Sequence, residues 1–89
     1  MPEIPKPLSK DRFPWERQRY ETRQAWAAFA AYRDLGLTRS QDKVAIELGK
    51  SANLMSRWSV RWSWVLRAEA WDSYQDAASR AQRLEDIKK

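Results

Sequence analysis

Six residues between positions 50 and 61 carry side chains that nucleic-acid-binding proteins use: Lys50, Ser51, Asn53, Ser56, Arg57 and Arg61. Arg57 or Arg61 can form a bidentate pair with O6 and N7 of guanine, and Asn53 can pair with adenine. Residues 50–67 contain four basic residues and no acidic residue. The segment therefore predicts contact with an anionic partner, and we expect this partner to be double-stranded DNA.

Phosphate contacts are expected from the start of the same segment. Lys50, Ser51 and Ser56 lie near the predicted N-terminus of a helix, where the helix dipole favours an anion. Arg39, in the connection before the preceding helix, is a further candidate for contact with the DNA backbone. A solvated basic face is the alternative interpretation of these cations.

The sequence offers little for catalysis or metal binding. It contains neither cysteine nor histidine, so it lacks thiolate and imidazole groups. Glu69, Asp72 and Asp76 lie three and four apart on a predicted helix, but a solvated helix face explains them better than a metal site. We therefore expect a protein that is not an enzyme, with no catalytic residue, no metal and no cofactor.

The overall charge and hydropathy agree with an anionic partner in an aqueous compartment. The 89 residues include 17 Lys and Arg against 12 Asp and Glu, which gives a formal net charge of +5. No apolar run approaches the roughly 18 residues that a membrane span needs. The N-terminus also lacks the hydrophobic segment of a signal peptide. A cytoplasmic protein without membrane contact is expected.

The spacing of apolar residues predicts four helices and no strand, over residues 22–35, 41–48, 52–62 and from 64 onwards. The first has one wide apolar face, formed by Ala25, Trp26, Phe29, Tyr32 and Leu35. Gly36 and Gly49 are placed to end the first two helices. Thr38 or Ser40 can cap the N-terminus of the second helix, and Ser51 can cap that of the third. The fourth carries an apolar stripe: Trp64, Ala68, Trp71, Tyr74, Ala78 and Ala81.

Both ends of the chain are expected to lie outside the helical body. All four prolines fall within the first 14 residues, which predicts an extended arm over residues 1–20. Phe13 and Trp15 can attach the end of this arm to the body. Its cations, Lys6, Lys10 and Arg12, can follow a minor groove, or the arm can be disordered. Alanine and charge dominate residues 79–89, so a helical tail that frays without a partner is expected.

The connection between the second and third helices has the spacing of a helix-turn-helix motif. Ala45 lies four residues before the turn residue Gly49, and a small side chain there lets the two helices cross closely. Met55 and Trp58 follow the glycine by six and nine residues and can pack both helices against the first. The predicted fold is all-α. It is a small helix-turn-helix (homeodomain-like) bundle over residues 21–78, with an extended N-terminal arm over 1–20 and a C-terminal helical tail over 79–89.

Helical geometry divides the third helix into two faces. At roughly 100° per residue, Met55, Trp58 and Trp62 fall within about 60° of one another. The opposite side carries Asn53, Ser56, Arg57 and Val60, with Arg61 at its edge. The tryptophans, Trp64 and Trp71 included, are therefore predicted to pack in the core, and the polar and basic residues to face outward.

The segments AWAAFAAYRDLG and KVAIELGKSANLMSRWSVRWSWVLRAEAWDSY resemble helix-turn-helix proteins of phages and prophages, namely terminase small subunits or their DNA-binding parts. The resemblance covers about residues 26–74. It rests most on Tyr32-Arg33, Leu35-Gly36, Leu48-Gly49-Lys50-Ser51 and the spacing of Trp58, Trp62 and Trp64. It implies recognition of DNA at a packaging site in a bacterial host cell, assembly into a homo-oligomer, and interaction with a large terminase subunit.

Two other functions are open from the sequence. A small phage or prophage transcriptional regulator would use the same motif, because a fold does not determine a single function. A protein-interaction module would use the scaffold without DNA, through an exposed apolar surface on the last helix or around Phe13 and Trp15.

Overall fold

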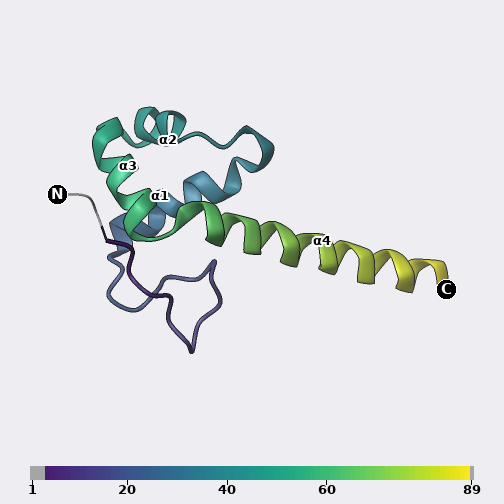
Figure 1. Ribbon diagram of the computed structural model, residues 1–89. Coiled ribbons are helices and arrows are strands. Elements are labelled where there is room, and N and C mark those ends of the chain that lie inside the picture. Colours follow the sequence, from purple (N-terminus) through teal and green to yellow (C-terminus); the bar gives the residue numbers. More distant parts are fainter. Residues whose placement is uncertain (1–3, 89) are drawn as a thin grey trace.

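A computed structural model describes residues 4–88, and all regular secondary structure in this range is helical, with no strand. The α-helices are α1 (Arg23–Asp34), α2 (Gln41–Leu48), α3 (Ala52–Arg61) and α4 (Trp64–Lys88), and a short 3₁₀ helix, η1 (Gly36–Thr38), lies between α1 and α2. Figure 1 shows α1, α2, α3 and the start of α4 gathered in one body, from which the rest of α4 projects. The predicted all-α class and the four helices are confirmed. Within residues 4–88, none of the helices combines the length and apolarity that crossing a membrane requires.

Hydroxyl side chains and a glycine set the ends of the helices. Thr22, Ser40 and Ser51 precede α1, α2 and α3, and each hydroxyl accepts a hydrogen bond from the backbone N–H three residues later, at 3.1, 3.3 and 3.1 Å. Gly49 ends α2 with a φ of 65°, a left-handed conformation that favours glycine. The N–H of Lys50 then donates to the Ala45 carbonyl at 2.9 Å, and the chain turns into α3.

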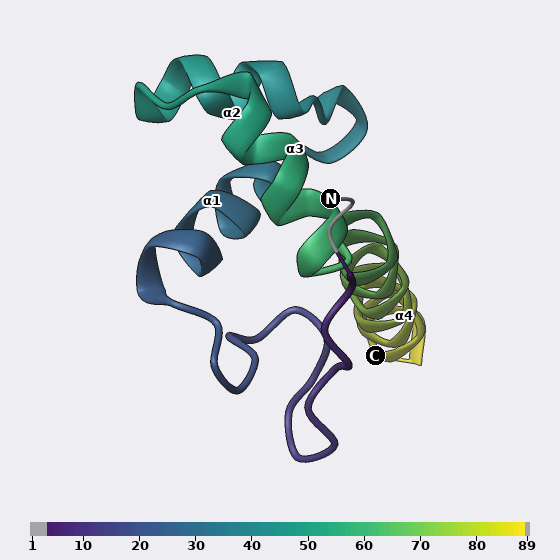
Figure 2. The same cartoon turned by 60° about the vertical axis from the view of Figure 1, so that its left-hand side comes forward.

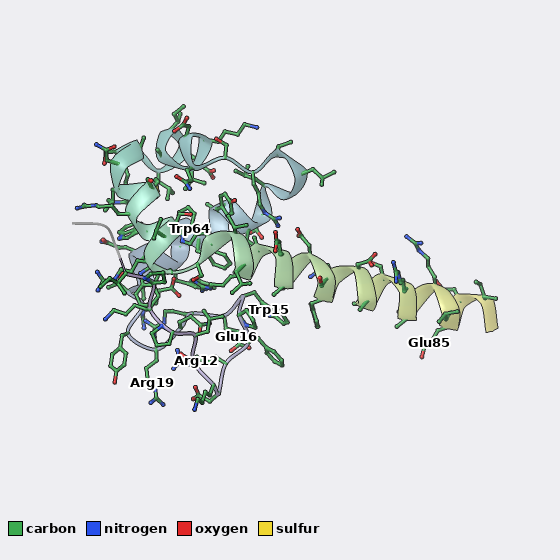
Figure 3. The ribbon with its side chains drawn as sticks, viewed as in Figure 1. Arg12, Trp15, Glu16, Arg19, Trp64 and Glu85 are labelled. Atoms are coloured by element: carbon green, nitrogen blue, oxygen red, sulfur yellow. The ribbon has the colours of Figure 1, made fainter. Side chains whose placement is uncertain are left out.

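The hydrophobic core lies where α1 faces α2, α3 and the first turns of α4. Its buried members are Ala25, Ala28, Phe29, Val44, Ala45, Met55, Trp62, Trp64 and Ala68. The Trp64 ring is fully buried, with its centroid 6.4 Å from that of Phe29 and 5.1 Å from that of Tyr32. Figure 3 shows Trp64 within the helical body. Large aromatic side chains supply much buried area per residue, which a chain this short needs.

The second half of α4 stands apart from the body. Residues 72–87 are all exposed, and they extend the molecule to 55 Å in its longest dimension. Figure 3 shows Glu85 far along this projection. The predicted apolar stripe therefore packs only as far as Tyr74, whose half-exposed ring contacts Trp15, while Ala78 and Ala81 face water. The tail is helical to Lys88, as predicted, and its fraying without a partner stays a prediction.

Residues 4–22 contain no helix, but they are folded against the body in a series of turns. Figure 2 shows this segment looping back beside α4 before it enters α1. The side chain of Gln18, which is buried, organises the turns: its Oε1 accepts from the Ser9 N–H at 2.7 Å, and its Nε2 donates to the carbonyls of Phe13 and Glu16 at 2.9 and 2.8 Å. The predicted extended arm is therefore a packed N-terminal segment.

Aromatic rings attach the N-terminal segment to α4. The Trp15 ring centroid lies 5.7 Å from that of Trp71 and 4.7 Å from that of Tyr74. Phe13 stacks on Trp15 with a centroid distance of 4.9 Å and an interplanar angle of 2°. The expectation that Phe13 and Trp15 hold this segment to the body is confirmed.

Candidate nucleic-acid interface

The outward side of α3 and the turn before it carry six of the seven residues predicted to contact DNA. Lys50, Ser51, Asn53, Ser56 and Arg57 are exposed, and Arg61 is half-buried. We call this set the α3 face. On the other side of the helix, Met55 and Trp62 are buried and Trp58 packs against the core. The predicted division of the helix into an inward tryptophan side and an outward polar side is therefore correct.

The inward side of α3 also contains a polar residue, Ser59, which was not among the predicted core residues. Ser59 is 7% exposed and lies between Met55 and Trp62 on the same stripe, at intervals of four and three residues. That spacing alone places position 59 on the core side. Together with the Ser51 cap, these inward contacts fix which way the α3 face points.

The N-terminal segment meets the end of α3. The Lys6 N–H donates to the Arg61 carbonyl at 2.8 Å, so the exposed Lys6 lies beside the last turn of this helix. The Arg61 guanidinium lies 5.9 Å from the centroid of the Trp62 ring. Arg12, by contrast, donates to the Arg17 carbonyl at 2.6 Å. That Lys6, Lys10 and Arg12 follow a minor groove stays a prediction.

Arg39 lies apart from the α3 face. It follows η1 at the N-terminal end of α2, whereas α3 begins after the C-terminal end (Figure 1). Its guanidinium holds both carboxylate oxygens of Asp72, at 2.6 and 2.8 Å, and donates to the Arg33 carbonyl at 2.7 Å. The hydrogen bond to Asp72 raises the pKa of Arg39 and lowers that of the carboxyl group. This side chain joins the α1–α2 connection to α4, and the structure does not bring it together with the other six.

Arg67 contributes nothing to the surface charge of the basic segment. It is fully buried and paired with Glu21, at an Nη1–Oε2 distance of 2.9 Å. The outward charge of residues 50–67 thus comes from three cations, and the count of four overstated it. The sequence held a signal for this: Arg67 lies three residues after Trp64 and four before Trp71, on the inward stripe of α4.

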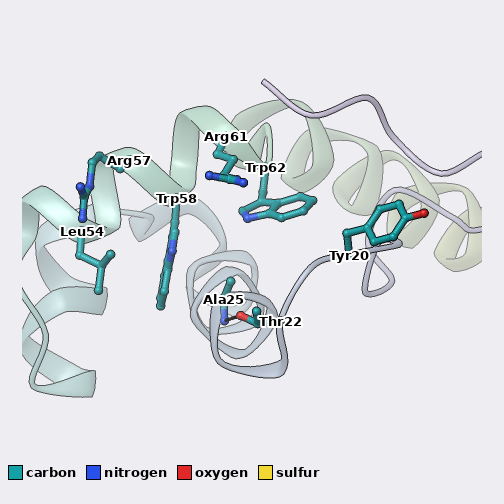
Figure 4. Close-up of a pocket in the computed structure, with 8 residues that line it drawn as sticks. All are labelled: Tyr20, Thr22, Ala25, Leu54, Arg57, Trp58, Arg61 and Trp62. Atoms are coloured by element: carbon teal, nitrogen blue, oxygen red, sulfur yellow. Dashed lines mark hydrogen bonds between the residues drawn. The ribbon is translucent and has the colours of Figure 1, made fainter. Parts of the chain in front are cut away.

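A hollow of about 310 Å³ lies along one edge of the α3 face. Its lining consists of Tyr20, Thr22, Ala25, Leu54, Arg57, Trp58, Arg61 and Trp62, and we call it the indole hollow. Figure 4 shows the α3 side chains facing the start of α1, with Tyr20 beyond Trp62 and its ring pointing away from α3. This hollow could not be predicted from the sequence, because Tyr20 and Thr22 precede α3 by about 30 residues.

Among the described residues, no three acidic side chains are grouped so that they could hold a metal ion. Asp72, one of the three acids considered for such a site, is instead the partner of Arg39. No protein family matches the chain, and no curated protein or solved structure matches it. The resemblance to phage terminase small subunits therefore rests on the sequence segments quoted above.

Proposed function

We propose that the protein binds double-stranded DNA through the α3 face. The proposal rests on the placement of Arg57 and Arg61 along one side of α3, with Lys50 in the turn before it, in a segment without acidic residues. On the opposite side, the buried Trp62 and the half-buried Trp58 pack against the core and support the helix for entry into a major groove.

The arrangement of α2 and α3 supports the same proposal. The two helices are joined by a tight turn at Gly49, and both pack on α1. In helix-turn-helix proteins, the second helix of such a pair lies in the major groove and its first residues contact base edges. Asn53 is the second residue of α3 and Arg57 lies in its next turn, and we propose that these two exposed side chains contact bases. We propose phosphate contacts for Lys50 and Ser51, which precede the N-terminus of α3, and for Ser56, which lies one turn into the helix.

For the biological role, we propose recognition of a packaging site, as in phage terminase small subunits. This step rests on the resemblance of residues 26–74 to those proteins. A single helix reads few base pairs, so useful specificity calls for several copies of the chain or for a partner. We therefore propose a homo-oligomer that acts with a large terminase subunit. A small phage regulator would use the α3 face in the same way and differ only in its target site.

One observation favours a protein partner as the second candidate. Phe13 is 59% exposed and Tyr74 49% exposed, and both belong to the aromatic cluster around Trp15. Exposed aromatic rings gathered at one place are common at protein interfaces. A module of this kind would bind through the cluster and leave the α3 face in water.

Titration with duplex DNA of random sequence at low salt distinguishes the two candidates. A DNA-binding α3 face predicts weak nonspecific affinity, with a Kd on the order of 10⁻⁴ to 10⁻⁶ M near physiological salt and tighter binding below it. If Lys50, Arg57 and Arg61 each meet one phosphate, log K should fall with log salt at a slope of about −3. The absence of any binding at low salt would reject DNA binding in favour of the protein partner.

A further inference from the structure

The lining of the indole hollow combines two kinds of recognition chemistry. It contains two guanidinium groups and three aromatic rings, and it has no carboxylate. Guanidinium groups attract phosphate, and indole and phenol rings offer flat apolar surfaces to planar groups. The ligand that matches both is planar and anionic. A hollow of about 310 Å³ is near the lower limit for ligand sites, which suits a ligand of the size of one nucleotide.

The backbone of Tyr20 is unusual for a bulky residue. Its φ is 70°, in the left-handed region that side chains other than glycine rarely adopt, and the residue is 86% exposed. Its neighbours hold this conformation: the Glu21 N–H donates to the Gln18 carbonyl at 3.0 Å, and the Gln18 N–H donates to the Glu21 carboxylate at 2.9 Å. Gln18 and Glu21 are both buried.

The positive φ of Tyr20 costs free energy, and the ring is too exposed for its burial to offset this cost. The turn holds an aromatic side chain in water at the rim of a basic hollow, in the place shown in Figure 4. Strained backbone conformations that the surrounding structure enforces occur often at ligand sites. Figure 4 shows the ring of Tyr20 pointing away from Arg57 and Arg61, so this exposed side chain has to rotate toward α3 to cover a planar group in the hollow.

We propose that the indole hollow binds an unpaired nucleotide. Tyr20 stacks on the base, and Arg57 and Arg61 attract the phosphate. A free mononucleotide and an unstacked nucleotide of a single strand present the same chemistry to this site. The proposal goes beyond duplex binding, because Tyr20 lies outside the α3 face and only the two arginines belong to both sites.

The test compares the wild type with Tyr20→Gly and Tyr20→Phe. Glycine accepts a positive φ, so Tyr20→Gly removes the ring without straining the turn, and Tyr20→Phe keeps the ring. Binding of a labelled oligothymidylate, which forms no duplex, is measured by fluorescence anisotropy at low salt. We expect Tyr20→Gly to bind about tenfold more weakly and Tyr20→Phe to bind like the wild type, as loss of one stacking contact predicts. The affinity for duplex DNA should be the same in all three proteins.

Competition with thymidine monophosphate separates the two sources of the nucleotide. If thymidine monophosphate displaces the oligonucleotide, the free mononucleotide is a ligand of the hollow. If it does not, while oligonucleotide binding still depends on Tyr20, the ligand is a nucleotide within a single strand. The proposal is overturned if the wild type binds neither probe, or if Tyr20→Gly binds the oligonucleotide as tightly as the wild type. Equal weakening of oligonucleotide and duplex binding by Tyr20→Gly would also overturn it. Failure of duplex binding alone would reject only the proposed function.

Discussion

Arg67 and Glu21 form a bidentate ion pair in the interior, with Nη1–Oε2 and Nη2–Oε1 distances of 2.9 and 3.0 Å. Neither side chain is exposed to solvent. The pair joins the first part of α4 to the residue that precedes the N-cap of α1. A buried ion pair is stable only when its remaining hydrogen-bonding groups also find partners.

The guanidinium of Arg67 meets this requirement through backbone carbonyls. It donates to the carbonyls of Pro14 at 2.6 Å, Glu16 at 2.9 Å and Trp62 at 3.1 Å. Its Cζ also lies 4.0 Å from the centroid of the Phe29 ring. One side chain thus connects the N-terminal segment, α1 and the α3–α4 corner. The N-terminal segment is therefore part of the folded unit.

Breaking this ion pair from one side should destabilise the protein strongly. Glu21→Gln leaves the Arg67 charge buried without its counterion, and we expect a loss of about 3–5 kcal/mol in the free energy of unfolding. Arg67→Met should cost at least as much, because three carbonyls also lose their donor. Urea denaturation of both single variants and the double variant measures these changes. Additive losses in the double variant, or single losses below about 1 kcal/mol, would contradict this role.

The Arg39–Asp72 ion pair should stabilise the folded protein by an amount that changes with pH. Arg39 lowers the pKa of Asp72 in the folded protein below its ordinary 3.8. The ionised carboxylate therefore stabilises the folded state above pH 3.8, and this stabilisation is lost as the pH falls through the pKa that Asp72 has in the folded protein. Because Asp72 is half exposed, we expect Asp72→Asn to cost only about 0.5–1 kcal/mol at neutral pH.

Urea denaturation of the wild type and Asp72→Asn at neutral pH and well below pH 3.8 tests this prediction. The difference between the two proteins should shrink at the lower pH. Asp76→Asn is the matched control, because Asp76 pairs with Arg80 on the exposed part of α4 and joins no two elements. Equal differences at both pH values would show that Asp72 acts through something other than its charge.

Replacement of Gly49, in the turn between α2 and α3, should lower the stability of the protein. A Cβ at position 49 would meet no atom within 4 Å, so the cost of Gly49→Ala comes from the φ of 65° alone. We expect a loss of about 1–2 kcal/mol, the usual cost of a left-handed conformation for an L-residue. Thermal unfolding measures it. A melting temperature equal to that of the wild type would mean that the turn relaxes without disturbing α3.

The exposed tail should be dispensable for folding. Deletion of residues 79–89 removes part of α4 in which all residues from 79 to 87 face water. Circular dichroism should therefore lose helical signal, while the free energy of unfolding changes by no more than about 0.5 kcal/mol. A larger loss, especially one that depends on protein concentration, would show that the tail contacts a second copy of the chain.

Local signals explain why the helices could be predicted from the sequence. The caps at Ser40 and Ser51 and the stop at Gly49 act on their own neighbours in the chain, so the bounds of α2 matched and those of α3 differed by one residue. The inward and outward sides of α3 likewise follow from the spacing of apolar residues within one helix.

Contacts between distant residues could not be predicted in the same way. Arg67 and Glu21 are 46 residues apart, and Arg39 and Asp72 are 33 apart. A count of charges treats a buried arginine and an exposed one alike, so it included Arg67 in the basic segment. Arg39 was predicted to contact DNA from its place in a connection, which says nothing of its partner Asp72. Prolines correctly indicated an N-terminal segment without helix, but they carry no information on the packing of Gln18 against its turns.

The central claim is that the cations of the α3 face bind duplex DNA. Its most direct test uses two variants that each remove two positive charges: Arg57→Ala with Arg61→Ala on the α3 face, and Arg80→Ala with Arg83→Ala on the exposed part of α4. Circular dichroism first establishes that both variants are folded. Both have the same net charge, so any difference in binding reports the position of the charges.

The measurement is the affinity for a random duplex as a function of salt. We predict that the α3 variant binds at least about tenfold more weakly at low salt, and that its slope of log K against log salt is flatter by about 2. The α4 variant should keep the wild-type affinity and slope. Equal affinities of the two variants would contradict DNA binding through the α3 face.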